Sequence, residues 1–192
     1  MEDLPSRLRR ETADLHSAIE TATGLPQTVH SRLDYQCLLA RLLGFHQAAE
    51  LVLADSRWDI GWAEHGLDPR RHLRSHLLEH DLRAMRVAPP PCATAFGGIN
   101  TFPGALGCLY VVEGSALGGR MIAPAIRAAI GDVPLTFFTG AGRGHPSPWR
   151  AVTGALRQFG HGGDCAAVID GARMTYAAFQ RYVTAPPAGV NA

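Results

Sequence analysis

Apolar residues recur at helical spacing along almost the whole chain, and this periodicity limits the fold more than any other feature. In the last periodic segment, one helical face carries Val168, Ala172, Tyr176, Phe179 and Val183. Capping residues and prolines predict helices at about residues 6–22, 31–56, 69–85, 101–130, 148–159 and 164–183. Loops rich in proline and glycine are expected at 87–100 and 131–146. The sequence therefore predicts an all-α, single-domain multi-helix bundle over residues 1–184 and a disordered tail at 185–192.

The composition limits which binding partners and which cellular compartment we expect for this protein. The 192 residues carry a net charge of +1, which gives no reason to expect nucleic acid or a membrane surface as a partner. The four cysteines are scattered without paired spacing, as is typical of reduced thiols, and the charged N-terminus has no apolar stretch of a signal peptide. No apolar run is long enough to span a membrane. We therefore expect a cytoplasmic protein, in which arginine, the one basic residue type besides histidine, would bind anions.

The helix expected at 101–130 contains glycines where a helix is least tolerant of them: Gly107, Gly114, Gly118 and Gly119. Each costs roughly 1 kcal/mol relative to alanine. One explanation is close packing of two helices. The other is a flat ligand lying directly on the backbone, because Gly114 and Gly118 are one turn apart and clear a strip about 6 Å long. Gly119 would then let the helix bend, and Ser115 would bring a hydroxyl near the strip. Spacing alone leaves both explanations open.

The first predicted helix carries a possible ligand-binding flank. Arg9, His16 and Glu20 fall on one side of its apolar stripe, with Thr12 between them and the stripe. Glu20 could accept a hydrogen bond from His16, which would fix the imidazole tautomer and raise the basicity of the other ring nitrogen. Arg9 could bind a carboxylate about 10 Å away along the helix. A lone helical histidine is usually just partly buried, but combined with a bare-backbone helix and a free arginine it indicates heme.

At these residues the sequence resembles the heme oxygenases, most closely the bacterial ones associated with bacteriophytochromes. The matching segments are LRRETADLHSAIE at the proximal helix and LYVVEGSALGG at the distal helix, with a weaker third match at ARMTYAAF in the last helix. The three segments are spread over nearly the whole chain in the family's order and spacing. The resemblance therefore implies the fold of that family.

The resemblance also implies roles for particular residues. His16 would be the axial ligand of the heme iron, with Glu20 as its partner and Thr12 beside it. Gly114 and Gly118 would lie over the heme, with Gly119 completing the family's glycine pair. At positions that family members use for the heme propionates, this chain has Arg9 and Arg173.

One position departs from the pattern of many animal members. Ser115 stands where those proteins have an aspartate that organises water on the distal side, and bacterial relatives also tend to have serine there. The departure leaves open how bound oxygen is protonated.

The activity implied by the resemblance is cleavage of heme, as both substrate and cofactor, to biliverdin, CO and ferrous iron. Electrons would come from an external ferredoxin or reductase, because the chain has no Rossmann-type glycine motif. A bacteriophytochrome is a candidate acceptor of the biliverdin. Two alternatives are a heme-binding sensor or carrier without turnover, and a non-heme enzyme on the same scaffold. A thiamin-pyrimidine hydrolase would need a catalytic cysteine in a pocket, and a di-iron oxidase would need paired ExxH ligands, which are absent.

A second group of histidines has metal-ligand spacing. His72, His76 and His80 recur every four residues, as in some zinc sites, but the apolar residues of the same predicted helix centre on its opposite side. We therefore expect a solvated face here. The neighbouring arginines are expected to be solvated too, or to dock an acidic ferredoxin: Arg70, Arg71 and Arg74. The three tryptophans are expected to cap the core: Trp58, Trp62 and Trp149.

Overall fold

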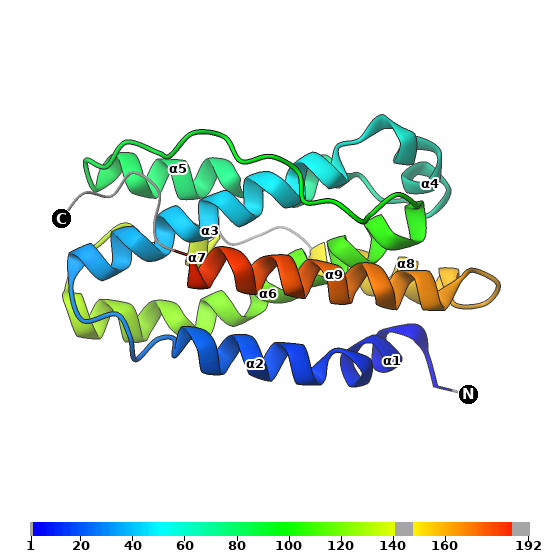
Figure 1. The fold of residues 1–192 in the computed structure, drawn as a ribbon, viewed down its shortest axis with the longest axis horizontal. Helices are drawn as coiled ribbons and strands as arrows, with labels where there is room; N and C mark the ends of the chain where they lie inside the picture. The colour runs from blue at the N-terminus through cyan, green and yellow to red at the C-terminus, as the bar shows by residue number, and fades with distance from the viewer. Residues whose placement is uncertain (1, 141–147, 186–192) are drawn as a thin grey trace.

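The computed structural model describes residues 2–140 and 148–185, and all regular elements within these ranges are helical (Figure 1). This confirms the predicted all-α bundle. Apart from Ala185, the tail predicted at 185–192 lies outside the described residues. The elements are α1 Leu4–Glu11, α2 Ala13–Thr23, α3 Arg32–Leu53, η1 Ser56–Trp58, α4 Asp59–Glu64, η2 Pro69–His72, α5 Ser75–Ala84, α6 Phe102–Ile130, α7 Thr136–Thr139, α8 Pro148–Phe159 and α9 Cys165–Thr184.

Helices α6 and α9 form the central packing contact of the bundle. A Cβ atom added at Gly107 would lie 2.1 Å from the carbonyl oxygen of Val168, and one added at Gly171 would lie 2.3 Å from that of Gly104. Side chains at these two positions would therefore push the backbones apart. α9 also packs against α2 and α3, so it joins the N-terminal helices to the rest of the bundle.

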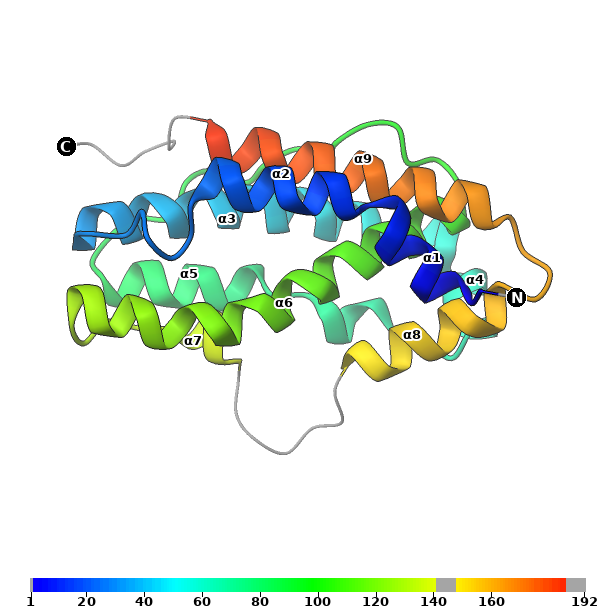
Figure 2. The same cartoon turned by 90° about the horizontal axis from the view of Figure 1, so that it is seen from below.

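The helix predicted at about 6–22 is two helices, so that prediction is wrong in its continuity. The chain leaves helical geometry at Thr12, with φ −120° and ψ 5°, and the Thr12 hydroxyl donates a hydrogen bond of 2.8 Å to the carbonyl oxygen of Leu8. Before this break α1 packs against α8 and also touches α9, whereas after it α2 packs mainly against α9. Figure 2 shows the change of direction between α1 and α2. The break allows two neighbouring helices to follow different partners.

The helix predicted at 69–85 is also interrupted. Its first turn is the 3-10 helix η2, and α5 begins at Ser75, whose backbone N–H donates to the Glu50 carboxylate of α3 at 2.7 Å. Two short helices, α4 and α7, lie where no helix was predicted. Asp81, fully buried on α5, begins α7 by accepting hydrogen bonds from the backbone N–H groups of Thr136 at 3.1 Å and Phe137 at 2.9 Å.

The tryptophans expected to cap the core differ in position. Trp58 and Trp62 lie inside it, and their indole N–H groups donate to the carbonyl oxygens of Val52 and Leu53. Trp149 packs at the edge of the core as a partly buried side chain. Across the described ranges, no single helix is both long and apolar enough to cross a membrane, although α3 together with residues 56–64 passes as a bent pair by length and composition.

Candidate functional site

The glycines of α6 divide into two groups with different surroundings. Among residues 2–140 and 148–185, a Cβ atom added at Gly118 would meet nothing within 4 Å, and one added at Gly114 would make an ordinary contact of 3.7 Å with the Trp149 ring. In contrast, Gly107 is pressed against α9, and a Cβ atom at Gly119 would lie 3.2 Å from Phe138 of α7. Helix packing therefore explains Gly107 and Gly119 but not Gly114 and Gly118.

The open glycines share their side of α6 with exposed apolar side chains. Leu117 and Met121 lie within about 60° of Gly114 around the helix axis, at about 100° per residue, and their exposed fractions are 43% and 81%. The result is an open face on α6 consisting of bare backbone flanked by flexible hydrophobic groups. Sequence reasoning missed Leu117 and Met121, although their spacing of three and seven residues from Gly114 carried the signal.

His16 projects from α2 with most of its side chain exposed. Its Nδ1 atom lies 3.6 Å from Glu20 Oε1, longer than a direct hydrogen bond but close enough for electrostatic attraction. Nε2 of His16 has no hydrogen-bond partner among residues 2–140 and 148–185. In the same ranges no three His, Cys, Asp or Glu side chains are grouped to hold a metal ion. A metal at His16 would therefore have to bring other ligands with it.

Aromatic side chains connect His16 to the glycine face. The rings of His16 and Tyr176 meet edge-on with centroids 6.2 Å apart, and those of Tyr110 and Trp149 lie 5.3 Å apart. Burial and, after it, the neighbouring Tyr110 hydroxyl raise the pKa of Tyr176 to about 12. Tyr110 is one turn before Gly114, which Trp149 contacts. Tyr176, Tyr110 and Trp149 belong to one hydrophobic cluster, which contacts His16 through Tyr176 and Gly114 through Trp149, and we call these three side chains the aromatic floor. Sequence reasoning had assigned them no role in the site.

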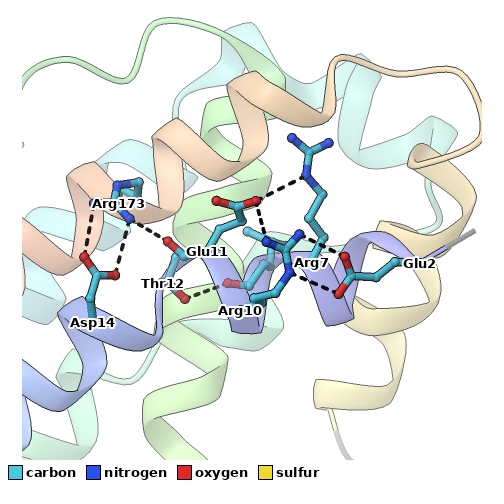
Figure 3. Close-up of polar contacts among 8 residues, drawn as sticks. Glu2, Arg7, Arg10, Glu11, Thr12, Asp14 and Arg173 are labelled. Carbon is cyan, nitrogen blue, oxygen red and sulfur yellow. Dashed lines mark hydrogen bonds and ion pairs between the residues drawn. The ribbon is translucent and has the colours of Figure 1, made fainter.

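The two arginines predicted to bind propionates are in different states. Arg9 is exposed and makes no ion pair or hydrogen bond within the described part of the chain. Burial raises the pKa of Tyr110, and the positive charge of Arg9 opposes that rise, which places Arg9 near the aromatic floor. Arg173 pairs with Asp14 at 3.3 Å and also donates to the carbonyl oxygen of Glu11 (Figure 3).

The other arginines of α1 are also paired, as Figure 3 shows. Arg7 lies 3.8 Å from Glu11, and Arg10 contacts both Glu2 and Glu11. Arg9 is thus the arginine of α1 that is available to an incoming anion.

The two hydroxyl groups predicted to take part in the site donate hydrogen bonds to backbone carbonyl groups close to them in the sequence. Thr12 is 2% exposed and donates to Leu8, as described above. Ser115 donates to the carbonyl oxygen of Val112 at 2.8 Å. Hydrogen bonds of this kind turn the hydroxyl back onto the helix and favour a local bend.

The histidines at positions 72, 76 and 80 do not form one solvated face. His76 and His80 are exposed, but His72 is 3% exposed and its Nδ1 atom lies 2.9 Å from Oε1 of Glu113. Arg74 is also largely covered. The prediction was wrong for His72 and Arg74 because it assumed one continuous helix, whereas η2 ends at His72.

Comparison with known proteins identifies a similar solved structure. The chain superposes on the heme oxygenase from Neisseria meningitidis, a structure determined with NO and CO bound, with a TM-score of 0.73 and 20% sequence identity. The match covers 95% of this chain and 91% of that one. No family model and no curated protein matches the sequence. At this level of identity the likeness concerns architecture, and this chain has the heme oxygenase fold.

Proposed function

We propose that this protein is a heme oxygenase that cleaves heme to biliverdin, CO and ferrous iron. The observation that carries the proposal is the bare backbone at Gly114 and Gly118: among the described residues, nothing lies within 4 Å of a Cβ atom added at Gly118, and at Gly114 the Trp149 ring of α8 is only in ordinary contact. It is joined through an aromatic floor to a histidine whose Nε2 atom is uncommitted. Bound heme would supply the iron at which dioxygen is activated. The likeness to a heme oxygenase structure supports this reading of the site.

The residues present fit heme better than a free metal ion. His16 offers a single nitrogen ligand, and a porphyrin brings its own equatorial nitrogens, so one protein ligand is sufficient. The side chains of Leu117 and Met121 are exposed and apolar, and they give the open face of α6 the apolar character that a flat macrocycle requires. Arg9 provides an unpaired guanidinium near Tyr110 for a carboxylate.

Each of these side chains has a distinct task in the proposed reaction. His16 would bind the iron through Nε2, while Glu20 orients the ring from the Nδ1 side. Gly114 and Gly118 would leave a narrow space against the backbone of α6, which directs a small ligand along the plane of the macrocycle. Leu117 and Met121 would exclude water from that space.

A second function is a heme-binding protein that does not turn over. It is favoured by Ser115, whose hydroxyl donates to Val112 and is not directed at the open face. Reduction of the heme-loaded protein in air separates the two functions. The oxygenase converts the heme spectrum into that of biliverdin, whereas a sensor or carrier retains heme. The external ferredoxin or reductase, the bacteriophytochrome acceptor and the cytoplasmic location remain predictions.

The proposal is tested by titrating hemin into the purified protein and three pairs of variants. We expect a sharp Soret band with one hemin per chain, and a weakened or shifted band for His16→Ala but not for His80→Ala, an exposed histidine on α5. Gly118→Leu should displace hemin, whereas Gly154→Leu should not, although a Cβ atom at Gly154 of α8 also meets open space. Arg9→Met should weaken binding more than Arg83→Met. Hemin bound equally well by all variants would refute the proposed site.

A further inference from the structure

A buried carboxylate directly precedes the open glycines of α6. Glu113 is 2% exposed, and its Oε1 atom lies 2.9 Å from Nδ1 of His72 and 4.0 Å from Nε of Arg74, within the range of an ion pair but without the geometry of a hydrogen bond. Burial of an unpaired carboxylate is very unfavourable, so Glu113 requires both neighbours. Neither His72 nor Arg74 has a place in the function proposed above.

The partners of Glu113 are themselves fixed by a third element. The backbone N–H groups of Arg74 and Ser75 both donate to the carboxylate of Glu50 on α3. The Ser75 hydroxyl donates to the same carboxylate. The turn that carries His72 and Arg74 is therefore held on α3 by Glu50. The same turn contacts α6 through Glu113.

The position of Glu113 on the helix makes this contact useful. At about 100° per residue, Glu113 points about 100° away from Gly114 and about 140° away from Gly118 around the axis of α6. A contact that fixes Glu113 on the inside of the bundle therefore fixes the two glycines on the outside. Before this segment α6 is held by α9 at Gly107, and after it by α7 at Gly119.

The segment between those two contacts is intrinsically weak. Gly114 and Gly118 lower its helical stability, and the hydrogen bond from Ser115 to Val112 favours bending. Figure 2 shows α6 running obliquely and then changing direction near its middle. A helical segment of low stability needs a side-chain contact with another element if its backbone is to keep one orientation.

We propose that His72 and Arg74 are positioning residues that hold Glu113, and thereby set the rotation and the local order of residues 114–118 of α6. We call the three side chains His72, Arg74 and Glu113 the Glu113 anchor. Its effect on the ligand rests on the proposed function, but its effect on α6 does not. The anchor therefore holds α6 from a side that lies about 100° to 140° around the helix axis from Gly114 and Gly118.

Hydrogen exchange of the ligand-free protein tests the anchor directly. In Arg74→Met we expect amides of residues 114–118 to exchange about tenfold faster, with residues 104–110 unchanged. The matched control is Arg83→Met, which removes an exposed arginine paired with Glu79 at 2.9 Å on α5. Arg74→Lys retains a cation and should restore most of the protection. Unchanged exchange at 114–118 in Arg74→Met would overturn the proposal.

A second set of variants covers the case in which Arg74→Met does not fold. His72→Gln and Glu113→Gln keep side chains of similar size, and both should accelerate exchange at 114–118. Adding His72→Gln to Glu113→Gln should then have little further effect, because Glu113→Gln already removes the charge that His72 and Arg74 both contact. Additive effects of the two changes would contradict the anchor.

The Soret band separates failure of the anchor from failure of the proposed function. If the protein binds hemin, loss of the anchor should broaden or shift the band while His16 remains intact. If the wild-type protein binds no hemin, the proposed function is wrong, and hydrogen exchange still decides whether the anchor orders α6. Normal hemin spectra together with normal exchange in the anchor variants would reject the anchor alone.

Discussion

Asp14 Oδ2 lies 3.3 Å from Arg173 Nη2, so an ion pair joins α2 to α9 (Figure 3). Asp14 precedes His16 by two residues on α2. The resemblance to heme oxygenases implies a propionate partner for Arg173, whereas in the structure this arginine is paired with the carboxylate of Asp14. Arg9, by comparison, has no ion pair within the described residues. The proposed ligand would therefore meet one free arginine and one that must exchange its partner.

Asp14→Asn should strengthen hemin binding. The change removes the carboxylate that competes for Arg173, and because the pair is exposed, the Kd should fall by about two- to fivefold. Absorbance titration at low ionic strength measures the effect. Asp68→Asn is the matched control, since it removes an exposed aspartate paired with Arg71 on η2. Equal or weaker binding by Asp14→Asn would show that Arg173 does not exchange partners.

Gly118→Ala should increase the stability of the ligand-free protein and decrease its affinity for hemin. Because open space surrounds a Cβ atom at this position, alanine should stabilise the ligand-free helix by up to about 1 kcal/mol. The same methyl group lies on the face proposed to contact heme and should raise the Kd for hemin. Gly154→Ala should give a similar stabilisation with unchanged hemin affinity. Urea unfolding and hemin titration provide the two readouts.

Gly107→Ala should destabilise the protein although it adds the same methyl group to the same helix. Its Cβ atom would lie 2.1 Å from the carbonyl oxygen of Val168, so α6 and α9 must separate. We expect a loss of about 2–3 kcal/mol in the free energy of unfolding. A stability equal to that of Gly118→Ala would show that α6 and α9 are not in backbone contact.

His46 should make stability depend on pH below neutrality. Its side chain is 1% exposed, and burial, followed by the charge of Arg74, lowers its pKa to about 3. An unfolded chain with a histidine pKa near 6.5 binds more protons than the folded chain between these values. Stability contributed by His46 is therefore complete above about pH 6.5 and falls as the pH decreases, by up to about 1.4 kcal/mol per pH unit.

His46→Phe tests this dependence. Phenylalanine can occupy the site because His46 packs between the rings of Phe45 and Phe137. Urea unfolding at pH 7 and pH 5 should show a smaller difference in the variant than in the wild type. His76→Phe, at an exposed position on α5, should leave the difference unchanged. Identical slopes for wild type and His46→Phe would assign the pH dependence to other groups.

Asp81→Ala should destabilise the contact between α5 and α7. The buried carboxylate accepts hydrogen bonds from two backbone N–H groups at the start of α7, and both would lose their partner. We expect a loss of about 2–3 kcal/mol in the free energy of unfolding. Asp81→Asn should recover part of it, because the amide oxygen can still accept one bond. An effect below 1 kcal/mol, on the order of an exposed cap, would contradict this role.

Local signals in the sequence were sufficient to predict most helix boundaries. Ser31 accepts a hydrogen bond from the backbone N–H of Asp34, and Thr101 accepts one from that of Gly104, as their positions before apolar periods predict. The break at Thr12 could not be predicted in this way, since the apolar stripe continues across it. It depends on α8 and α9, which are distant in sequence.

The sequence predicted which residues form the candidate site, and their role toward heme stays a prediction, whereas the surroundings of these residues could not be predicted. The glycine spacing in α6 left two explanations open, and the heme prediction came from combining it with His16, Glu20 and Arg9 and from the resemblance to heme oxygenases. However, spacing cannot distinguish Gly118 from Gly107 or Gly119, because the difference lies in which neighbour occupies the adjacent space. His72 was assigned to solvent for a similar reason, since Glu113 is its neighbour only in three dimensions.

The exposed Leu117 and Met121 have a consequence for the chain when it is empty. Apolar side chains exposed on a helix surface promote self-association, and a bound macrocycle that covered them would remove this tendency. Occupied chains would then persist, while vacant ones would be lost to aggregation or proteolysis. If heme is the ligand, as proposed above, the abundance of this protein in a cell should therefore follow the supply of heme.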